Sequence, residues 1–192
     1  MRVSCVLDTN VLVVAMAADH SSSIKPDATH VDDPVLRRQV LDWLIEFDKS
    51  TQAIVIDYNG LIWDEYRGKS RDTKLSEQDY CMQLILNKKD RCLATYIELE
   101  VDQHGHARLP KGLSDHVTDL DDRKMVAAVL AARELGDNSR LVNACDTDWF
   151  DCEDALQAHG VRVEQLLDVW LRKKWRAMKF SDSGAAKTKK SK

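Results

Sequence analysis

With 192 residues, of which 44% are hydrophobic and 31% charged, the chain has the composition of one soluble globular domain with a substantial core. This balance excludes general disorder, and no apolar run approaches the roughly 20 residues that a membrane-spanning helix needs. The five cysteines form no CxxC pair and are odd in number, which predicts reduced thiols in a cytoplasmic protein.

Charge is distributed unevenly along the chain. Residues 172–192 contain nine basic side chains and one acidic one, a local net charge of +8, so the preceding residues carry −12. We therefore expect an acidic domain over residues 1–179 and a basic, disordered tail over residues 180–192. A basic end predicts contact with a polyanion such as RNA, and the nucleic-acid-binding candidates are Arg172, Lys173, Lys174, Arg176 and Lys179.

The chain opens with a short apolar segment, Val3–Leu7, that stops abruptly at Asp8 and is followed by Thr9 and Asn10. This composition favours a strand that is enclosed on both faces, and residues 11–18 then suit a helix. Ligand sites in open α/β sheets lie beyond the carboxyl ends of strands, so Asp8 is a candidate site residue. A helix N-cap role alone would also explain an aspartate at this position.

The middle of the chain alternates between helical and extended patterns. A polar stretch over residues 19–33 predicts a loop, and Asp33 followed by Pro34 is typical of a helix start. The apolar spacing then predicts, in order, a helix to about residue 49, a strand over 52–56, a helix from 57 to about 68 that carries Glu65, a helix from 76, an extended run over 93–101 and a hairpin that ends near 110.

Three aspartates, Asp119, Asp121 and Asp122, precede an apolar helical pattern over residues 125–135. A carboxylate at a helix start interacts favourably with the helix dipole, by roughly 0.3–1 kcal/mol. Capping therefore explains one or two of the three aspartates, whereas a third adds repulsion.

A further apolar run over residues 141–145 predicts a strand, and it too ends in acid, at Asp146 and Asp148. Two separate strands that deliver aspartate at their carboxyl ends are a stronger indication of a site than either strand alone. The remaining patterns predict a short helix over 151–160, a strand over 161–163 and a long helix over 164–179.

Four segments, in this order, resemble the PIN-domain nucleases, a family that includes toxin-type and RNA-processing ribonucleases. Together the segments cover residues 1 to about 165. They are VLDTN at the start, WDEY in the helix after the second strand, DLDDRKMVAAVLAA at the acidic helix start and LVNACDTDW at the later strand.

The resemblance implies a three-layer α/β/α fold with a central parallel sheet of four to five strands. It also implies a catalytic set of four acids. Three of these acids would bind metal together with the auxiliary acid Asp148, and Asn10 would be a polar neighbour of the site. The catalytic set is Asp8, Glu65, Asp122 and Asp146, and the metal ligands are Asp8, Asp122, Asp146 and Asp148. Asp121 is the reserve choice for the third position, and Asp119 is a further acid beside it.

The chemistry of the residues agrees with this role. Several carboxylates in one pocket raise one another's pKa values, and such a cluster persists chiefly when a divalent cation neutralises it. Oxygen ligands alone select Mg²⁺ or Mn²⁺. We therefore predict a metal-dependent endoribonuclease in which Glu65 holds or deprotonates the attacking water.

Two other functions fit parts of the sequence. A catalytically inactive PIN-like module would use the basic end to bind RNA or regulate another protein. A phosphatase of the haloacid dehalogenase type also begins with a strand that ends in aspartate, but its motif needs an acid where Asn10 stands. The resemblance leaves open single-stranded DNA as a substrate, an inhibitory protein partner as in toxin–antitoxin pairs, and assembly as a homodimer.

Overall fold

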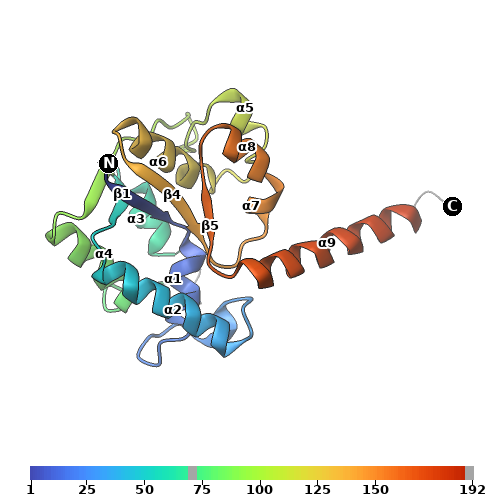
Figure 1. Ribbon diagram of the computed structural model, residues 1–192, viewed down its shortest axis with the longest axis horizontal. Coiled ribbons are helices and arrows are strands. Elements are labelled where there is room, and N and C mark those ends of the chain that lie inside the picture. The colour runs from blue at the N-terminus through green and yellow to red at the C-terminus, as the bar shows by residue number, and fades with distance from the viewer. Residues whose placement is uncertain (69–72, 189–192) are drawn as a thin grey trace.

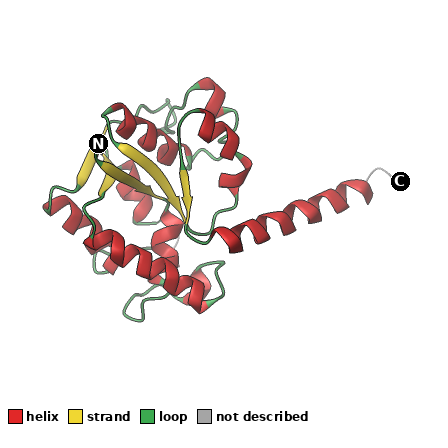
Figure 2. Cartoon of the chain, viewed as in Figure 1, coloured by secondary structure: helices red, strands yellow, loops and turns green. Residues whose placement is uncertain are grey.

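A computed structural model describes residues 1–68 and 73–188, with side chains through residue 180. Five parallel strands form one central sheet in the order β3-β2-β1-β4-β5, and helices flank it, which confirms the three-layer α/β/α prediction (Figures 1 and 2). The strands are β1 (Val3–Leu7), β2 (Ala53–Asp57), β3 (Ala94–Ile97), β4 (Asn138–Asn143) and β5 (Val163–Gln165).

The central strands are the most apolar because both of their faces are covered. Every residue of β2 is buried, as are four of the five in β1. Figure 1 shows α6 on one side of the sheet and α1, α2 and α4 on the other. The helices are α1 (Thr9–Met16), α2 (Pro34–Lys49), α3 (Leu61–Tyr66), α4 (Tyr80–Asp90), α5 (Lys111–Ser114), α6 (Arg123–Glu134), α7 (Asp148–Asp151), α8 (Glu153–Ala158) and α9 (Asp168–Thr188), with one 3-10 turn, η1 (Pro26–Ala28).

The helix start that was predicted at Asp33 and Pro34 is confirmed, whereas the helix that was expected from residue 57 begins at Leu61. Asp33 accepts a hydrogen bond of 2.8 Å from the backbone N–H of Val35 at the start of α2. Asp57 accepts from the N–H groups of both Leu61 and Ile62, at 2.9 and 2.8 Å, and so caps α3. The aspartate at the end of β2 is therefore fully occupied by the helix that follows it.

Strands near the sheet edges differ from the sequence expectation. The extended run forms strand only over β3 and then turns back through a single antiparallel bridge between Val101 and Ala107. The last strand begins at Val163, because the N–H of Val161 instead bonds the carbonyl of Leu156 and closes α8. The predicted helix over residues 151–160 is divided at Cys152 into α7 and α8.

Helix α9 is longer than predicted and extends away from the body of the molecule (Figure 1). It continues through residue 188, so the expected tail over 180–192 begins as helix rather than as disordered chain, and residues 189–192 lie outside the described part. Alanines and lysines favour helix in this segment, whereas Gly184 disfavours it most and the serines, Asp182 and Thr188 are weaker helix formers. No helix within the described ranges is long and apolar enough to cross a membrane.

Candidate active site at the carboxyl edge of the sheet

Asp8 stands directly after the central strand β1 and is only 9% exposed. Its Oδ1 accepts a hydrogen bond of 3.1 Å from the backbone N–H of Asn10, which is the N-cap bond of α1. Its Oδ2 accepts one of 2.7 Å from Nε1 of the buried Trp149. Capping thus accounts for one carboxylate oxygen, while the other is held by a residue far along the chain.

The environment of Asp8 favours its neutral form. Burial, and then the charge of Asp146, raise its pKa to about 7, while the bonds from Trp149 and Asn10 oppose the shift. The charge of Glu65 raises it further. Acids that were predicted from three different parts of the sequence therefore act on one another at this edge.

Asn10 joins the ends of β1 and β4. Its Nδ2 donates to Oδ1 of Asn143 at 2.9 Å, and its Oδ1 accepts from the N–H groups of Ala144 and Cys145 at 2.9 and 3.3 Å. Both ends of the amide are thus used in fixing the segment that leads from β4 to Asp146. Asn10 is a positioning residue rather than a free ligand.

Asp146 follows that segment and is half-buried. Burial, followed by the charges of Asp148 and Asp119, raises its pKa, against a backbone bond of 2.8 Å from Asp148 to its Oδ1. Lys174 of α9 lowers the pKa and so lies close enough to contribute a positive charge. Asp148 is exposed and its carboxylate faces the same region.

Asp122 is distinct from the other two acids of its cluster. It stands at the start of α6, yet its side chain makes no capping bond there. Burial and then the charges of Asp8 and Asp146 raise its pKa to about 8. Asp119 instead accepts from the N–H of Asp121 at 2.8 Å, and Asp121 is exposed. Among the three, Asp122 therefore shares an environment with Asp8 and Asp146 most directly.

Glu65 lies beside a lysine that sequence analysis did not single out. Nζ of Lys124 is 2.9 Å from Oε2 of Glu65 and 3.7 Å from Oδ1 of Asp121, and the Lys124 and Glu65 side chains are mostly buried. The ion pair with Lys124 therefore holds the Glu65 carboxylate in place.

A pocket of about 110 Å³ opens beside these acids. Its lining includes Asp119, Asp122, Asp148 and Trp149. Within the described ranges, no group of three or more His, Cys, Asp or Glu side chains is arranged so that it could hold a metal ion. The acids are thus close enough to shift one another's pKa values without forming a ready coordination shell.

The predicted nucleic-acid-binding residues lie on the first turns of α9, and they are not equivalent. Arg172 pairs with Asp168 at 2.9 Å, and Lys179 pairs with Asp151 at 2.8 Å. Nζ of Lys174 lies 5.0 Å from the centre of the Trp170 ring. Lys173 and Arg176 are exposed.

Two residues of the site, Trp149 and Lys124, were missed by the sequence analysis. Trp149 belongs to the DTDW segment, where an N–H donor beside several carboxylates was a usable signal. Lys124 follows the acidic cluster by two residues, but its contact with Glu65 joins residues far apart in sequence and had no local signal.

Comparison of the chain with protein-family models, with curated proteins and with solved structures finds no match in any of the three.

Proposed function

We propose that this protein is a metal-dependent endoribonuclease that uses Mg²⁺ or Mn²⁺ to hydrolyse RNA phosphodiester bonds. One observation carries the proposal: Asp8, Asp122 and Asp146 come from distant parts of the chain and lie close together at one sheet edge, where the charge of Asp146 raises the pKa of Asp8 and the charges of Asp8 and Asp146 raise the pKa of Asp122. Gathering these charges costs stability in the absence of a cation. A resident divalent cation would offset that cost.

The donor set suits such an ion. Carboxylate oxygens are hard ligands that favour Mg²⁺ and Mn²⁺, and Asp122 makes no side-chain hydrogen bond within the described residues, so both of its oxygens are available. Asp8, Asp122 and Asp146 would hold the ion, with Asp148 at the rim. When bound, it would polarise the phosphate and lower the pKa of a water molecule.

The remaining residues position these ligands and the substrate. Trp149 holds one oxygen of Asp8, and Asn10 fixes the loop that carries Asp146. Lys124 fixes Glu65, which would hold or deprotonate the attacking water. Lys174 contributes positive charge beside Asp146, where an RNA phosphate would approach.

The test is cleavage of end-labelled RNA by the full chain, with Mg²⁺, with Mn²⁺ and with EDTA. We expect cleavage only with a metal, and a loss of several orders of magnitude in Asp122→Asn and Asp146→Asn, because an amide is a far poorer ligand for a hard cation. Asp27→Asn, on the exposed turn η1, is the matched control and should cleave normally. Asp8→Asn is a less clean test because one Asn oxygen cannot replace both acceptors of Asp8.

Each outcome distinguishes the proposal from its alternatives. Full activity in folded Asp122→Asn and Asp146→Asn would remove these acids from the active site. RNA binding without cleavage under any metal would favour a non-catalytic RNA-binding module. Hydrolysis of a small phosphomonoester instead of RNA would favour a phosphatase, although both ends of Asn10 are engaged where that class needs an acid.

A further inference from the structure

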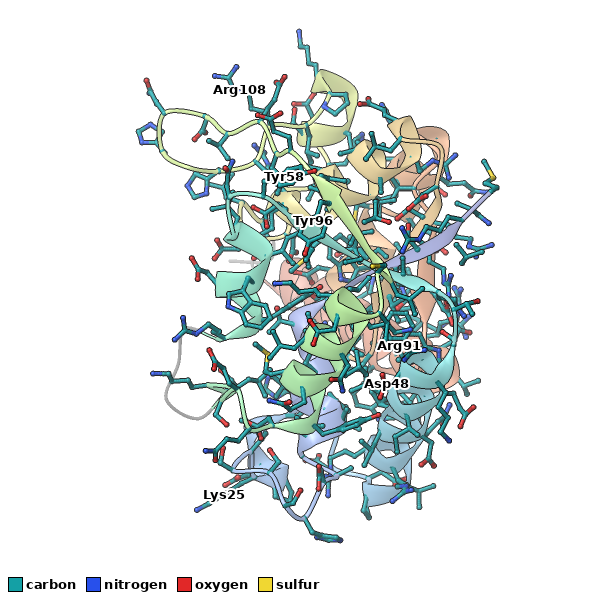
Figure 3. All side chains as sticks on the ribbon, turned by 90° about the vertical axis from the view of Figure 1, so that its left-hand side faces the viewer. Lys25, Asp48, Tyr58, Arg91, Tyr96 and Arg108 are labelled. Carbon is teal, nitrogen blue, oxygen red and sulfur yellow. The ribbon has the colours of Figure 1, made fainter. Side chains whose placement is uncertain are left out.

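Two tyrosines form an exposed stacked pair on the outer part of the sheet. Tyr58 follows β2, Tyr96 lies on the edge strand β3, and their ring centres are 5.5 Å apart with planes inclined by 24°. Tyr58 is 72% exposed and Tyr96 39% exposed. Figure 3 shows the two side by side near the end of β3. Tyrosine is intermediate in burial, but two exposed rings stacked on each other form an aromatic surface of the kind that interfaces use.

The pair lies at the same edge of the sheet as the acidic site. Cys5 of β1 is opposite Ile54 of the parallel strand β2, so Asp8 falls opposite Asp57 and Tyr58 comes directly after it. Adjacent strands are about 4.8 Å apart. Tyr58 also begins the segment that leads into α3, which carries Glu65. A nucleic acid strand that reaches Asp8 could therefore extend across β2 to the tyrosines.

A carboxylate, that of Glu98, follows Tyr96 by two residues. The N–H of Tyr58 donates to the carbonyl of Ile97, the last residue of β3, and Glu98 follows directly. Exposure alternates along this stretch, so Tyr96 and Glu98 both lie on the solvent side of the chain. Within the described part of the molecule, the Glu98 carboxylate has no hydrogen bond or ion pair. It therefore remains available as an acceptor two residues beyond Tyr96.

We propose that Tyr58 and Tyr96 form a stacking platform for one unpaired RNA base, and that Glu98 makes the platform prefer guanine. This inference deepens the proposed ribonuclease function, because it names an unpaired strand as the substrate. Bases stack on exposed aromatic rings irrespective of sequence. A carboxylate offers two acceptors, which match the two adjacent N–H donors on the Watson–Crick edge of guanine.

The arrangement favours a base over the phosphate backbone. Tyr96 restrains the Tyr58 ring from one side, so less rotational freedom is lost when a base covers the ring's other face. Glu98 would repel a phosphate at the same place. The sugar–phosphate backbone is then left to approach the metal site and α9, while the base turns toward the sheet edge.

The test measures binding of two 10-nucleotide single-stranded RNAs, U10 and the same strand with one central guanine, to the full chain in EDTA. Tyr58→Ala should weaken binding of the guanine strand by about 5- to 150-fold, because it removes one base stack. Tyr58→Phe, which keeps the ring, should bind within about twofold of the original protein. Glu98→Gln should bind U10 unchanged and lose the preference for the guanine strand.

The outcomes separate this inference from the proposed function. A folded Tyr58→Ala protein that binds both RNAs as tightly as the original overturns the platform, and a lower melting temperature alone would assign the pair to sheet stability. An intact guanine preference in Glu98→Gln overturns the role of Glu98. Tyr58-dependent binding without any cleavage in Mg²⁺ or Mn²⁺ would support the platform and contradict the nuclease. Metal-dependent cleavage that is unaffected by Tyr58→Ala would support the nuclease and contradict the platform.

Discussion

The indole N–H of Trp149 donates a 2.7 Å hydrogen bond to Oδ2 of Asp8, which joins the first turn of α7 to the end of the central strand β1. Both groups are buried. The bond therefore does two things at once: it orients the carboxylate, and it favours the charged form that burial opposes.

We expect Trp149→Phe to destabilise the protein by about 1.5–3 kcal/mol at pH 8, since a hydrogen bond to a buried charged group is lost while most of the ring volume remains. Thermal or denaturant unfolding measures this change. Trp43→Phe is the matched control, because Trp43 is half-buried and its N–H makes no hydrogen bond within the described residues. Equal destabilisation of the two variants would show that the Asp8 bond contributes nothing beyond ring packing.

Divalent metal should raise the melting temperature of the protein. A ligand that binds only the native state at 100 times its Kd stabilises that state by about 2.7 kcal/mol. For a chain of this size, the corresponding rise is roughly 5–11 °C. The measurement compares Mg²⁺ and Mn²⁺ with NaCl at equal ionic strength. A rise that persists in Asp122→Asn would place the ion elsewhere on the molecule.

Stability of the metal-free protein should fall as pH rises from about 4 to about 8. Asp8 and Asp122 have pKa values raised from 3.8 to about 7 and about 8, so the native state binds more protons than the unfolded chain in this range. We expect a lower melting temperature in EDTA at pH 8 than at pH 5.5. Asp122→Asn should reduce this difference, and Asp27→Asn should leave it unchanged. A pH dependence that is identical in Asp122→Asn would contradict the raised pKa of Asp122.

Removal of residues 180–192 should leave the fold intact, because Phe180 is exposed and α9 extends away from the body of the molecule (Figure 1). The deletion takes away four lysines, so RNA binding should weaken. The slope of the logarithm of the binding constant against the logarithm of the salt concentration should become shallower by about 0.7 for each phosphate that these lysines neutralise. A full-length variant with these four lysines changed to glutamine separates charge from length. An unchanged slope would leave Lys173, Lys174 and Arg176 to bind the phosphates.

The central part of the fold was predictable because its strands are enclosed on both faces. Burial on two sides requires a continuous apolar run, and the runs at β1 and β2 leave little alternative. The sequence predicts the strands at the sheet edges less well. β5 contains Glu164, which pairs with Arg140 of the neighbouring strand, so the charged residue that stabilises this strand also obscured its position.

The candidate site was predictable only where it depends on strand ends. Asp8 and Asp146 follow apolar runs, and the rule that sites lie beyond the carboxyl ends of strands brings them together. The partners Trp149 and Lys124 depend instead on how helices α6 and α7 approach that edge. No local sequence pattern indicates such a contact, so the sequence predicted the acids but not Trp149 and Lys124, which hold two of them in place.

The parallel strand order has a consequence for synthesis of the protein. Asp8 directly follows β1, and one of the two neighbours of this strand in the sheet is β4, which comes much later in the chain and whose register pairs Leu7 with Val142. The acids from the two strands therefore cannot meet until the ribosome has released β4 and the segment that follows it. A growing chain that ends before Asp146 has no completed acidic edge, so a nuclease built on these residues would be inert beside the message that encodes it.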